Sequence, residues 1–277
     1  MKRNLLIIFC LSLFNMQICL SQTSVLQTTA INEALGNTSA TLSNYGSVFS
    51  NVAGLAEIKE VSIAASYKVI PNALWQNTMS ASSTVPIKFG TVGLGFTRLG
   101  DDIFNQQVVS MGFANRFGIA SIGIKANYLQ YSIEGFNSKS IPFFDLGGIV
   151  ELTPQLFIGA YIINLTQTKL STFQNERFPT IIDAGISFRP TDKLMINVEV
   201  EQDIDFSPTL KAGIGYSPIK NFSLRTGINT SPNRQYFGLG FIPNNILLHI
   251  DYSLSNDSNL GVSHQMSISY GVLKPTK

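Results

Sequence analysis

The sequence LGVSHQMSISYGV, residues 260–272, alternates larger, mostly apolar side chains with small or polar ones along its whole length. Successive side chains of a β-strand point to opposite faces, so this segment has one largely apolar face and one face of Gly, Ser and Gln. Residues 194–201 and 222–229 alternate in the same way. The pattern predicts strands whose two faces meet different surroundings.

Similar runs cover most of the chain after residue 58, and their number is typical of a membrane barrel. We count about fourteen segments of roughly ten residues, the length and even number of a transmembrane β-barrel. A soluble sandwich would also alternate, but its outer faces would carry charge. Here the second face is rich in Gly, Ser, Asn and Thr. We expect strands near residues 59–68, 74–85, 89–98, 105–116, 119–133, 142–152, 155–165, 179–189, 193–202, 208–217, 221–229, 234–241, 245–254 and 260–272.

The sequence therefore predicts an all-β fold, a transmembrane antiparallel up-and-down β-barrel over residues 58–273 whose outer face meets outer-membrane lipid. Tight turns, many containing Pro, alternate with connections that are generally longer, notably residues 134–140 and 166–177. Short turns on one side and longer loops on the other are typical of outer-membrane barrels. We expect a location in the outer membrane of a Gram-negative bacterium.

The first residues are typical of a secretory signal peptide, with a basic start, an apolar run over residues 5–14 and an expected cut after Ser21. Both cysteines, Cys10 and Cys19, lie in this segment of residues 1–21, so the mature chain is expected to lack thiol chemistry. Loss of Lys2 and Arg3 from the 19 basic residues leaves 17, equal to the 17 acidic residues. This balance argues against a nucleic-acid partner, which needs a basic patch. No motif indicates a metal or another cofactor.

Residues 30–56, AINEALGNTSATLSNYGSVFSNVAGLA, differ from the alternating segments because they combine small and amide residues with single hydrophobic ones. We expect residues 22–57 to fold as a compact plug with the strands around it. Its candidate signature residues are Gly36, Asn51, Ala53, Gly54 and Leu55.

This segment resembles the N-terminal signature of the PorV/PorQ-type outer-membrane barrels, a family within the FadL-like superfamily of long-chain fatty-acid transporters. That signature reads roughly A-R-x-x-G-L-G-G, then an acidic pair, then N-P-A-G-L-A. The chain departs from it where Ile31 replaces the Arg, Asn44 and Tyr45 the acidic pair, and Val52 the Pro. The positions that match are Ala30, Leu35, Gly36, Leu42, Ser47, Asn51, Ala53, Gly54, Leu55 and Ala56. The resemblance also implies a barrel of fourteen strands.

Two functions follow from the resemblance. The PorV/PorQ side implies a non-enzymatic protein associated with type IX secretion, which receives or displays cargo at the outer membrane and has secretion components or exported proteins as partners. The alternative is FadL-like transport of a hydrophobic small molecule, with the plug as a hatch. The shortness of the loops favours the first function. An outer-membrane hydrolase is a distant third.

Polar candidates on the predicted lumen face are Glu199, Lys211, Arg225, His249 and Asp251. His249 and Asp251 could form a catalytic pair, but no motif marks a third catalytic group, and an interior hydrogen-bonded pair is the favoured interpretation. The other charges are expected to compensate one another across neighbouring strands. Aromatic residues near strand ends, Tyr161 among them, are expected on the outer face as interfacial girdles.

Overall fold

The computed structural model describes residues 29–136, 138–169, 178–204, 206–244, 247–258 and 260–272 of the 277-residue chain. The expected signal peptide, the first part of the expected plug segment and most of the longest expected loop lie outside the described residues. Within the described residues, no helix has the length and apolar character needed to cross a membrane.

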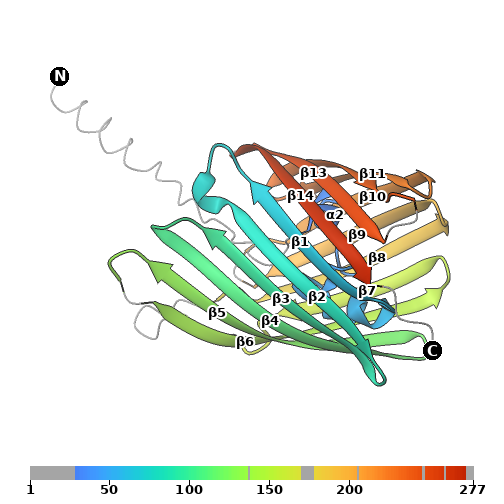
Figure 1. Cartoon of the computed structure of the whole chain (residues 1–277), viewed down its shortest axis with the longest axis horizontal. Helices are drawn as coiled ribbons and strands as arrows, with labels where there is room; N and C mark the ends of the chain where they lie inside the picture. The colour runs from blue at the N-terminus through green and yellow to red at the C-terminus, as the bar shows by residue number, and fades with distance from the viewer. Residues whose placement is uncertain are drawn as a thin grey trace, which may run out of the picture.

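The chain forms a closed antiparallel barrel of fourteen strands (Figure 1). Each strand pairs with its neighbours in sequence, and β1 pairs with β14 to close the ring. The predicted fold class is therefore confirmed. The strands are β1 (Val61–Val69), β2 (Thr78–Ile87), β3 (Gly90–Gly100), β4 (Phe104–Phe117), β5 (Ala120–Ile133), β6 (Lys139–Thr153), β7 (Leu156–Ile163), β8 (Ile181–Thr191), β9 (Leu194–Asp203), β10 (Thr209–Ile219), β11 (Phe222–Thr230), β12 (Asn233–Phe241), β13 (Leu248–Asp257) and β14 (Gly261–Val272).

The two ends of the barrel differ in their connections. At the end called here the turn end, five connections are only two residues long, as between β4 and β5. At the other end, the loop end, the longest connection runs from residue 164 to residue 180. Two strands begin three or four residues later than expected, β13 and β2. In front of β2, Leu74–Gln76 form the 3₁₀ helix η4 instead, because Asn77 Oδ1 accepts a hydrogen bond from Ile70 N at 3.1 Å and holds this connection as a turn.

The two faces of the wall follow the predicted alternation. In β9, Val198 is 47% exposed on the outer face, whereas Asn197 and Glu199 are 2% and 3% exposed on the lumen face. Outward apolar side chains recur around the barrel and form the surface that meets lipid. The prediction for Tyr161 was wrong: this side chain was expected on the outer face, but it is buried and faces the lumen.

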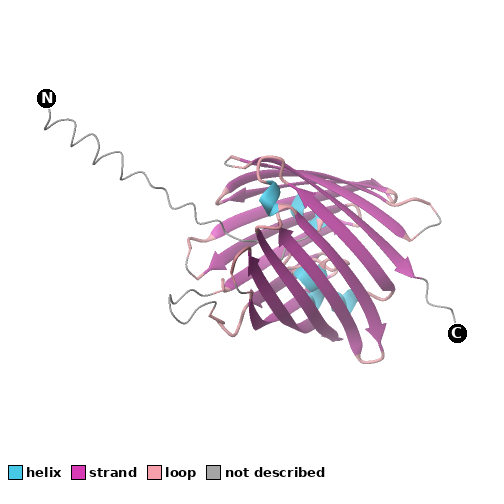
Figure 2. Cartoon of the chain, turned by 60° about the vertical axis from the view of Figure 1, so that its left-hand side comes forward, coloured by secondary structure: helices cyan, strands magenta, loops and turns pink. Residues whose placement is uncertain are grey.

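The segment before β1 lies inside the barrel as a plug (Figure 2). It contains the helix α2 (Ala30–Ala34) and the 3₁₀ helices η2 (Ser47–Phe49) and η3 (Val52–Glu57). Thr29 caps α2, since its side chain accepts from Asn32 N, and Gly36 ends it with a φ of 71° that suits glycine. Apolar plug residues such as Leu35, Val48 and Leu55 have no exposed surface. The small plug expected with the barrel is thus present.

Glycines on the lumen face bring the wall close to the plug backbone. A Cβ added at Gly213 would lie 2.3 Å from Leu35 O, and one added at Gly159 would lie 1.9 Å from Ala40 O. Atoms cannot approach that closely, so these positions hold only glycine while the plug stays where it is. Further wall glycines whose Cβ would meet the plug within 3.0 Å are Gly93, Gly95, Gly112, Gly123, Gly147, Gly227 and Gly238.

Candidate functional site

Four of the five predicted signature residues lie together at η3. Asn51 caps this helix through its Oδ1, which accepts from Ala53 N at 3.1 Å. Its Nδ2 donates to Ala40 O at 2.5 Å within the plug and to Gly148 O at 3.1 Å in β6. One amide side chain therefore ties two parts of the plug to the barrel wall.

The remaining signature residues act through their size. A Cβ on Gly54 would lie 2.3 Å from Leu42 O, so this position allows two plug segments to touch. Leu55 fills the space left by Gly93, where an added Cβ would lie 2.8 Å from Leu55 Cδ1. Gly36 is separate from the other four and lies against β10 and β11.

Two of the polar candidates, Glu199 and Lys211, belong to a buried group that we call the acid–lysine cluster, made of Asp183, Glu199, Glu201 and Lys211. Lys211 Nζ lies 3.4 Å from Asp183 Oδ1, 3.5 Å from Glu199 Oε1 and 2.5 Å from Glu201 Oε2. Strand register causes the clustering, because Lys211 stands opposite Glu199 and Glu201 opposite Asp183. From the sequence, charges on neighbouring strands were expected to compensate one another, and Lys211 and its three carboxylate neighbours are arranged in this way.

Glu199 also binds the plug directly. Its Oε2 accepts hydrogen bonds from Ser39 N at 2.8 Å and Ala40 N at 2.7 Å. Tyr161, on β7, is close by, with 3.0 Å between its hydroxyl and Ser39 Oγ. The sequence placed Glu199 on the lumen face, but its contact with the plug could not be read from alternation alone.

Arg225 and Asp251 form a second pair next to the plug. Arg225 Nη1 donates to Asp251 Oδ1 at 2.7 Å, and the Tyr45 hydroxyl donates to Asp251 Oδ2 at 3.0 Å. Within the described residues, Asp251 thus pairs with Arg225 and the plug rather than with His249. The cause is geometric: residues two apart on a strand are separated by roughly 6.6 Å.

His249 instead lines a cavity of about 660 Å³ at the turn end, called here the vestibule. The plug contributes one side of it through Ile31 and residues 43–45, and β10 to β14 contribute the other. Its charged and titratable lining residues are Tyr45, Glu57, Lys59, Glu60, Lys220, Arg225 and His249. Within the described part of the chain, no group of three or more His, Cys, Asp or Glu residues could hold a metal ion.

Glu33 of α2 anchors the other end of the plug and was not predicted. Its carboxylate lies 2.6 Å from Lys68 Nζ on β1 and accepts from the hydroxyls of Ser253 and Ser255 on β13. Burial alone would raise the pKa of the Glu33 carboxyl, but the charge and hydrogen bond of Lys68, with both serine hydroxyls, hold this pKa below its usual value. The ion pair and hydrogen bonds of Glu33 therefore outweigh the effect of its burial on the pKa of the carboxyl.

A polar layer in the wall was also missed. Lys125 Nζ lies 2.9 Å from Asp145 Oδ2, and both side chains are buried, at 0% and 2% exposed. Asp145 also accepts from Asn127 Nδ2 and from Asn164 N, each at 2.9 Å. Alternation could have found this pair, because the two residues stand opposite each other on β5 and β6.

Apolar side chains fill the lumen beyond this layer, toward the loop end of β3 to β8. We call them the apolar lumenal cluster. Phe143 and Phe178 are in ring contact, with centroids 4.6 Å apart. The cluster includes one plug residue, Ala40, and this contact joins it to the segment that Glu199 binds. Its buried members are Ala40, Leu99, Val108, Leu129, Ile141, Phe143, Tyr161, Ile163 and Phe178.

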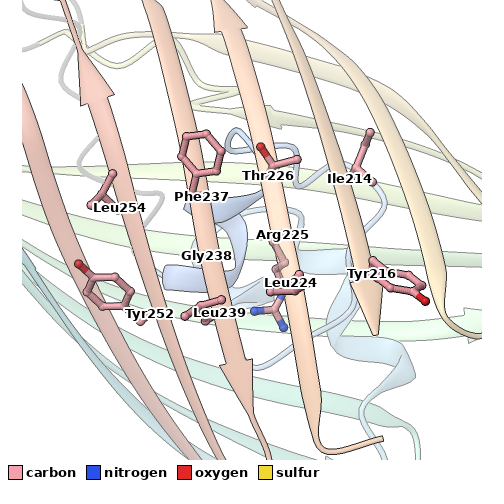
Figure 3. A pocket seen from close by; sticks show the side chains of 10 residues that line it. All are labelled: Ile214, Tyr216, Leu224, Arg225, Thr226, Phe237, Gly238, Leu239, Tyr252 and Leu254. Atoms are coloured by element: carbon pink, nitrogen blue, oxygen red, sulfur yellow. The ribbon is translucent and has the colours of Figure 1, made fainter. Parts of the chain in front are cut away.

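The outer face carries a groove of about 620 Å³ across β10 to β13 (Figure 3). Figure 3 shows aromatic and aliphatic side chains around it, whereas the Arg225 side chain lies on the plug side of β11. The groove belongs to the lipid-facing surface. Its lining residues are Ile214, Tyr216, Leu224, Arg225, Thr226, Phe237, Gly238, Leu239, Tyr252 and Leu254.

A closed barrel with an apolar outer face, a filled lumen and an internal plug defines the class of protein: an outer-membrane β-barrel. No protein-family model matches the sequence, and no curated protein matches it. Solved structures do match the fold.

Three of the similar structures are named as toluene transporters or as a channel for monoaromatic hydrocarbons. The toluene transporter TodX of P. putida aligns with a TM-score of 0.64 at 10% identity, over 91% of this chain and 100% of that one. The toluene transporter TbuX of Ralstonia pickettii aligns with a TM-score of 0.62 at 12% identity, over 89% and 98% of the two chains. The monoaromatic hydrocarbon channel CymD aligns with a TM-score of 0.64 at 12% identity, over 91% and 99%.

These similarities concern the fold, and they support a location in the outer membrane of a Gram-negative bacterium. The barrel fold that the resemblance implies is supported, but nothing in the comparisons points to the PorV/PorQ group specifically. The structural comparisons likewise give no support to a role in type IX secretion. The similar proteins are described as channels and transporters rather than enzymes.

Proposed function

We propose that the protein transports a hydrophobic small molecule across the outer membrane. The observation that carries this proposal is the apolar lumenal cluster. Lumen-facing positions of outer-membrane barrels are normally polar. Here Val108, Leu129 and Phe143 face inward at the loop end and are at most 1% exposed.

The cluster has the chemistry of a site for an apolar ligand. Such sites are lined mainly by aliphatic and aromatic side chains, with few polar groups for orientation. Tyr161 supplies a hydroxyl at its edge, and the Lys125–Asp145 pair lies next to it in the polar layer. Each methylene of a ligand removed from water here would contribute about 0.8 kcal/mol to binding.

The fold comparisons support this function over the secretion role. Transport of hydrophobic molecules was the alternative expectation from the sequence, and the similar structures are named as hydrocarbon channels and toluene transporters. No contact among the described residues favours a secretion partner. The secretion role remains a sequence-based expectation without structural support.

The test is uptake of radiolabelled toluene by intact Gram-negative cells that express the protein, compared with cells that carry an empty vector. β4 offers a matched pair of isosteric changes, because Val108 faces the cluster at 1% exposed and Val109 faces lipid at 55% exposed. Val108→Thr adds a hydroxyl to the apolar site at a cost of about 1–3 kcal/mol, so uptake should fall at least several-fold. Val109→Thr should leave uptake unchanged. Uptake no higher than in the empty-vector cells would rule out this transport function.

A further inference from the structure

The stretch of the plug from Thr38 to Thr41 is the part most closely held by the barrel wall between β7 and β9. The strongest contact of this stretch is with Glu199. One oxygen of the Glu199 carboxylate accepts hydrogen bonds from two successive backbone amides, Ser39 N at 2.8 Å and Ala40 N at 2.7 Å. Two successive backbone N–H groups that converge on one anionic oxygen form a nest for a negative charge. The contact is charge-assisted and buried.

Glu199 depends on this contact because it has few other partners. Its second oxygen, Oε1, lies 3.5 Å from Lys211 Nζ and has no hydrogen-bond partner among the described residues. Lys211 is shared with Asp183 and Glu201, so one ammonium faces three buried carboxylates. A buried carboxylate that loses its hydrogen bonds is strongly destabilised. The plug amides therefore complete the stabilisation of the acid–lysine cluster.

Each of the other wall contacts of this stretch is a single hydrogen bond, and among the described residues only the one from Arg189 involves a charge. Asn197 Nδ2 donates to Thr38 Oγ1 at 3.2 Å, and the partly buried Arg189 donates to Thr41 O at 3.1 Å. A charge-assisted hydrogen bond is roughly twice as strong as a neutral one. The pair of bonds to Glu199 is thus the contact whose loss would free this stretch first.

The position of the stretch makes its release consequential. Ala40 packs in the apolar lumenal cluster on the loop-end side, and the plug continues through residues 43–45 into the wall of the vestibule on the turn-end side. Movement of the plug away from β7 to β9 would open the part of the lumen between the vestibule and the apolar lumenal cluster. While it stays bound, the described residues fill the lumen between them.

We propose that Glu199 is the latch of the plug: a positioning residue that holds residues 38–41 against the wall and keeps the barrel closed to ions. The idea that this latch controls a transport path rests on the transport function proposed above. Its test measures ion leakage and uses no transported ligand, so the two proposals fail separately.

The experiment compares purified wild-type protein with Glu199→Gln by conductance in planar lipid bilayers. The amide keeps the shape of the side chain and removes its charge, which should raise the fraction of time in conducting states about tenfold or more because charge-assisted bonds become neutral ones. The matched control is Asp257→Asn, another buried carboxylate, which binds Arg234 and Leu260 N at the loop end and has no part in the sites described above. It should stay as closed as the wild type.

A reversible staple separates a latch from a general loosening of the barrel. Thr38→Cys and Asn197→Cys are introduced together with Glu199→Gln and joined by a short bis-methanethiosulfonate cross-linker, because their side chains touch in the native protein. The cross-linked protein should close, and a reducing agent should reopen it. If Glu199→Gln does not assemble, Glu199→Asp replaces it in the experiment. The shorter side chain keeps a carboxylate near Lys211 but moves it away from the plug amides, so this variant should also conduct ions.

The proposal is overturned if assembled Glu199→Gln or Glu199→Asp is as closed as the wild type. It is equally overturned if Asp257→Asn leaks to the same extent, or if the cross-linker leaves the conductance of the Glu199 variant unchanged.

Discussion

Gly159→Ala tests whether the plug backbone lies directly against β7. The added Cβ would lie 1.9 Å from Ala40 O, whereas ordinary contact begins near 3.4 Å, so the carbonyl must move by about 1.5 Å. That movement stretches the bond from Asn51 Nδ2 to Ala40 O, now 2.5 Å, and the bond from Ala40 N to Glu199, now 2.7 Å. Overpacking typically costs 1–3 kcal/mol and hydrogen bonds to charged groups about 1.5–3 kcal/mol. Because relaxation spreads the strain, we expect a loss of about 3 kcal/mol in the free energy of unfolding.

The assay is urea unfolding in lipid vesicles, followed by the gel mobility of unheated samples. Gly148→Ala is the control, because it lies on the neighbouring strand and its added Cβ would meet only Ser121 O, at 3.9 Å. We expect this control to stay within about 0.5 kcal/mol of the wild type. Equal stability of the Gly159 variant and the wild type, or equal losses in the two variants, would refute the close packing of plug and wall.

Three further predictions concern the outer face, the polar layer and the plug. Val198→Arg, in the middle of β9 and 47% exposed, should cost about 2–4 kcal/mol of folding free energy in lipid vesicles, while Ile219→Arg at the turn end of β10 should cost about 0–1 kcal/mol. Lys125→Met should lower the free energy of unfolding by about 3–5 kcal/mol, because it leaves the Asp145 carboxylate without its ion-pair partner. Adding Asp145→Leu to this variant should restore most of that stability in the same unfolding assay. Ser47→Cys, at a position with no exposed surface, should react with a membrane-impermeant thiol reagent at least tenfold more slowly in the folded protein than after heat denaturation; equal rates would mean that the plug is open to water.

Alternation predicts the barrel well because a membrane wall has two chemically different sides. Val198 and Glu199 are neighbours in sequence and lie on opposite faces, as the period of two requires. The same rule fails in β7, where Leu156, Phe157 and Ile158 are all apolar and give no alternation to read. Tyr161 was therefore assigned to the wrong face.

The candidate site was predictable only in part, for a related reason. Charges on the lumen face stand out, so Glu199 and Lys211 were found and Lys125 could have been. Inward apolar residues such as Val108 look like outward ones in the sequence, and the apolar lumenal cluster was missed. Contacts between the plug and the wall join residues that are far apart in sequence, such as Ser39 and Glu199, and no local pattern encodes them.

The first helix of the plug binds across the seam where the barrel closes. Ala30 N donates to Ser267 of β14, whose hydroxyl in turn donates to Ser66 of β1, and Glu33 bridges Lys68 of β1 to β13. The binding site of α2 is therefore complete only when the last strand has paired with the first one. Docking of α2 therefore stabilises closed barrels over those still open at the seam.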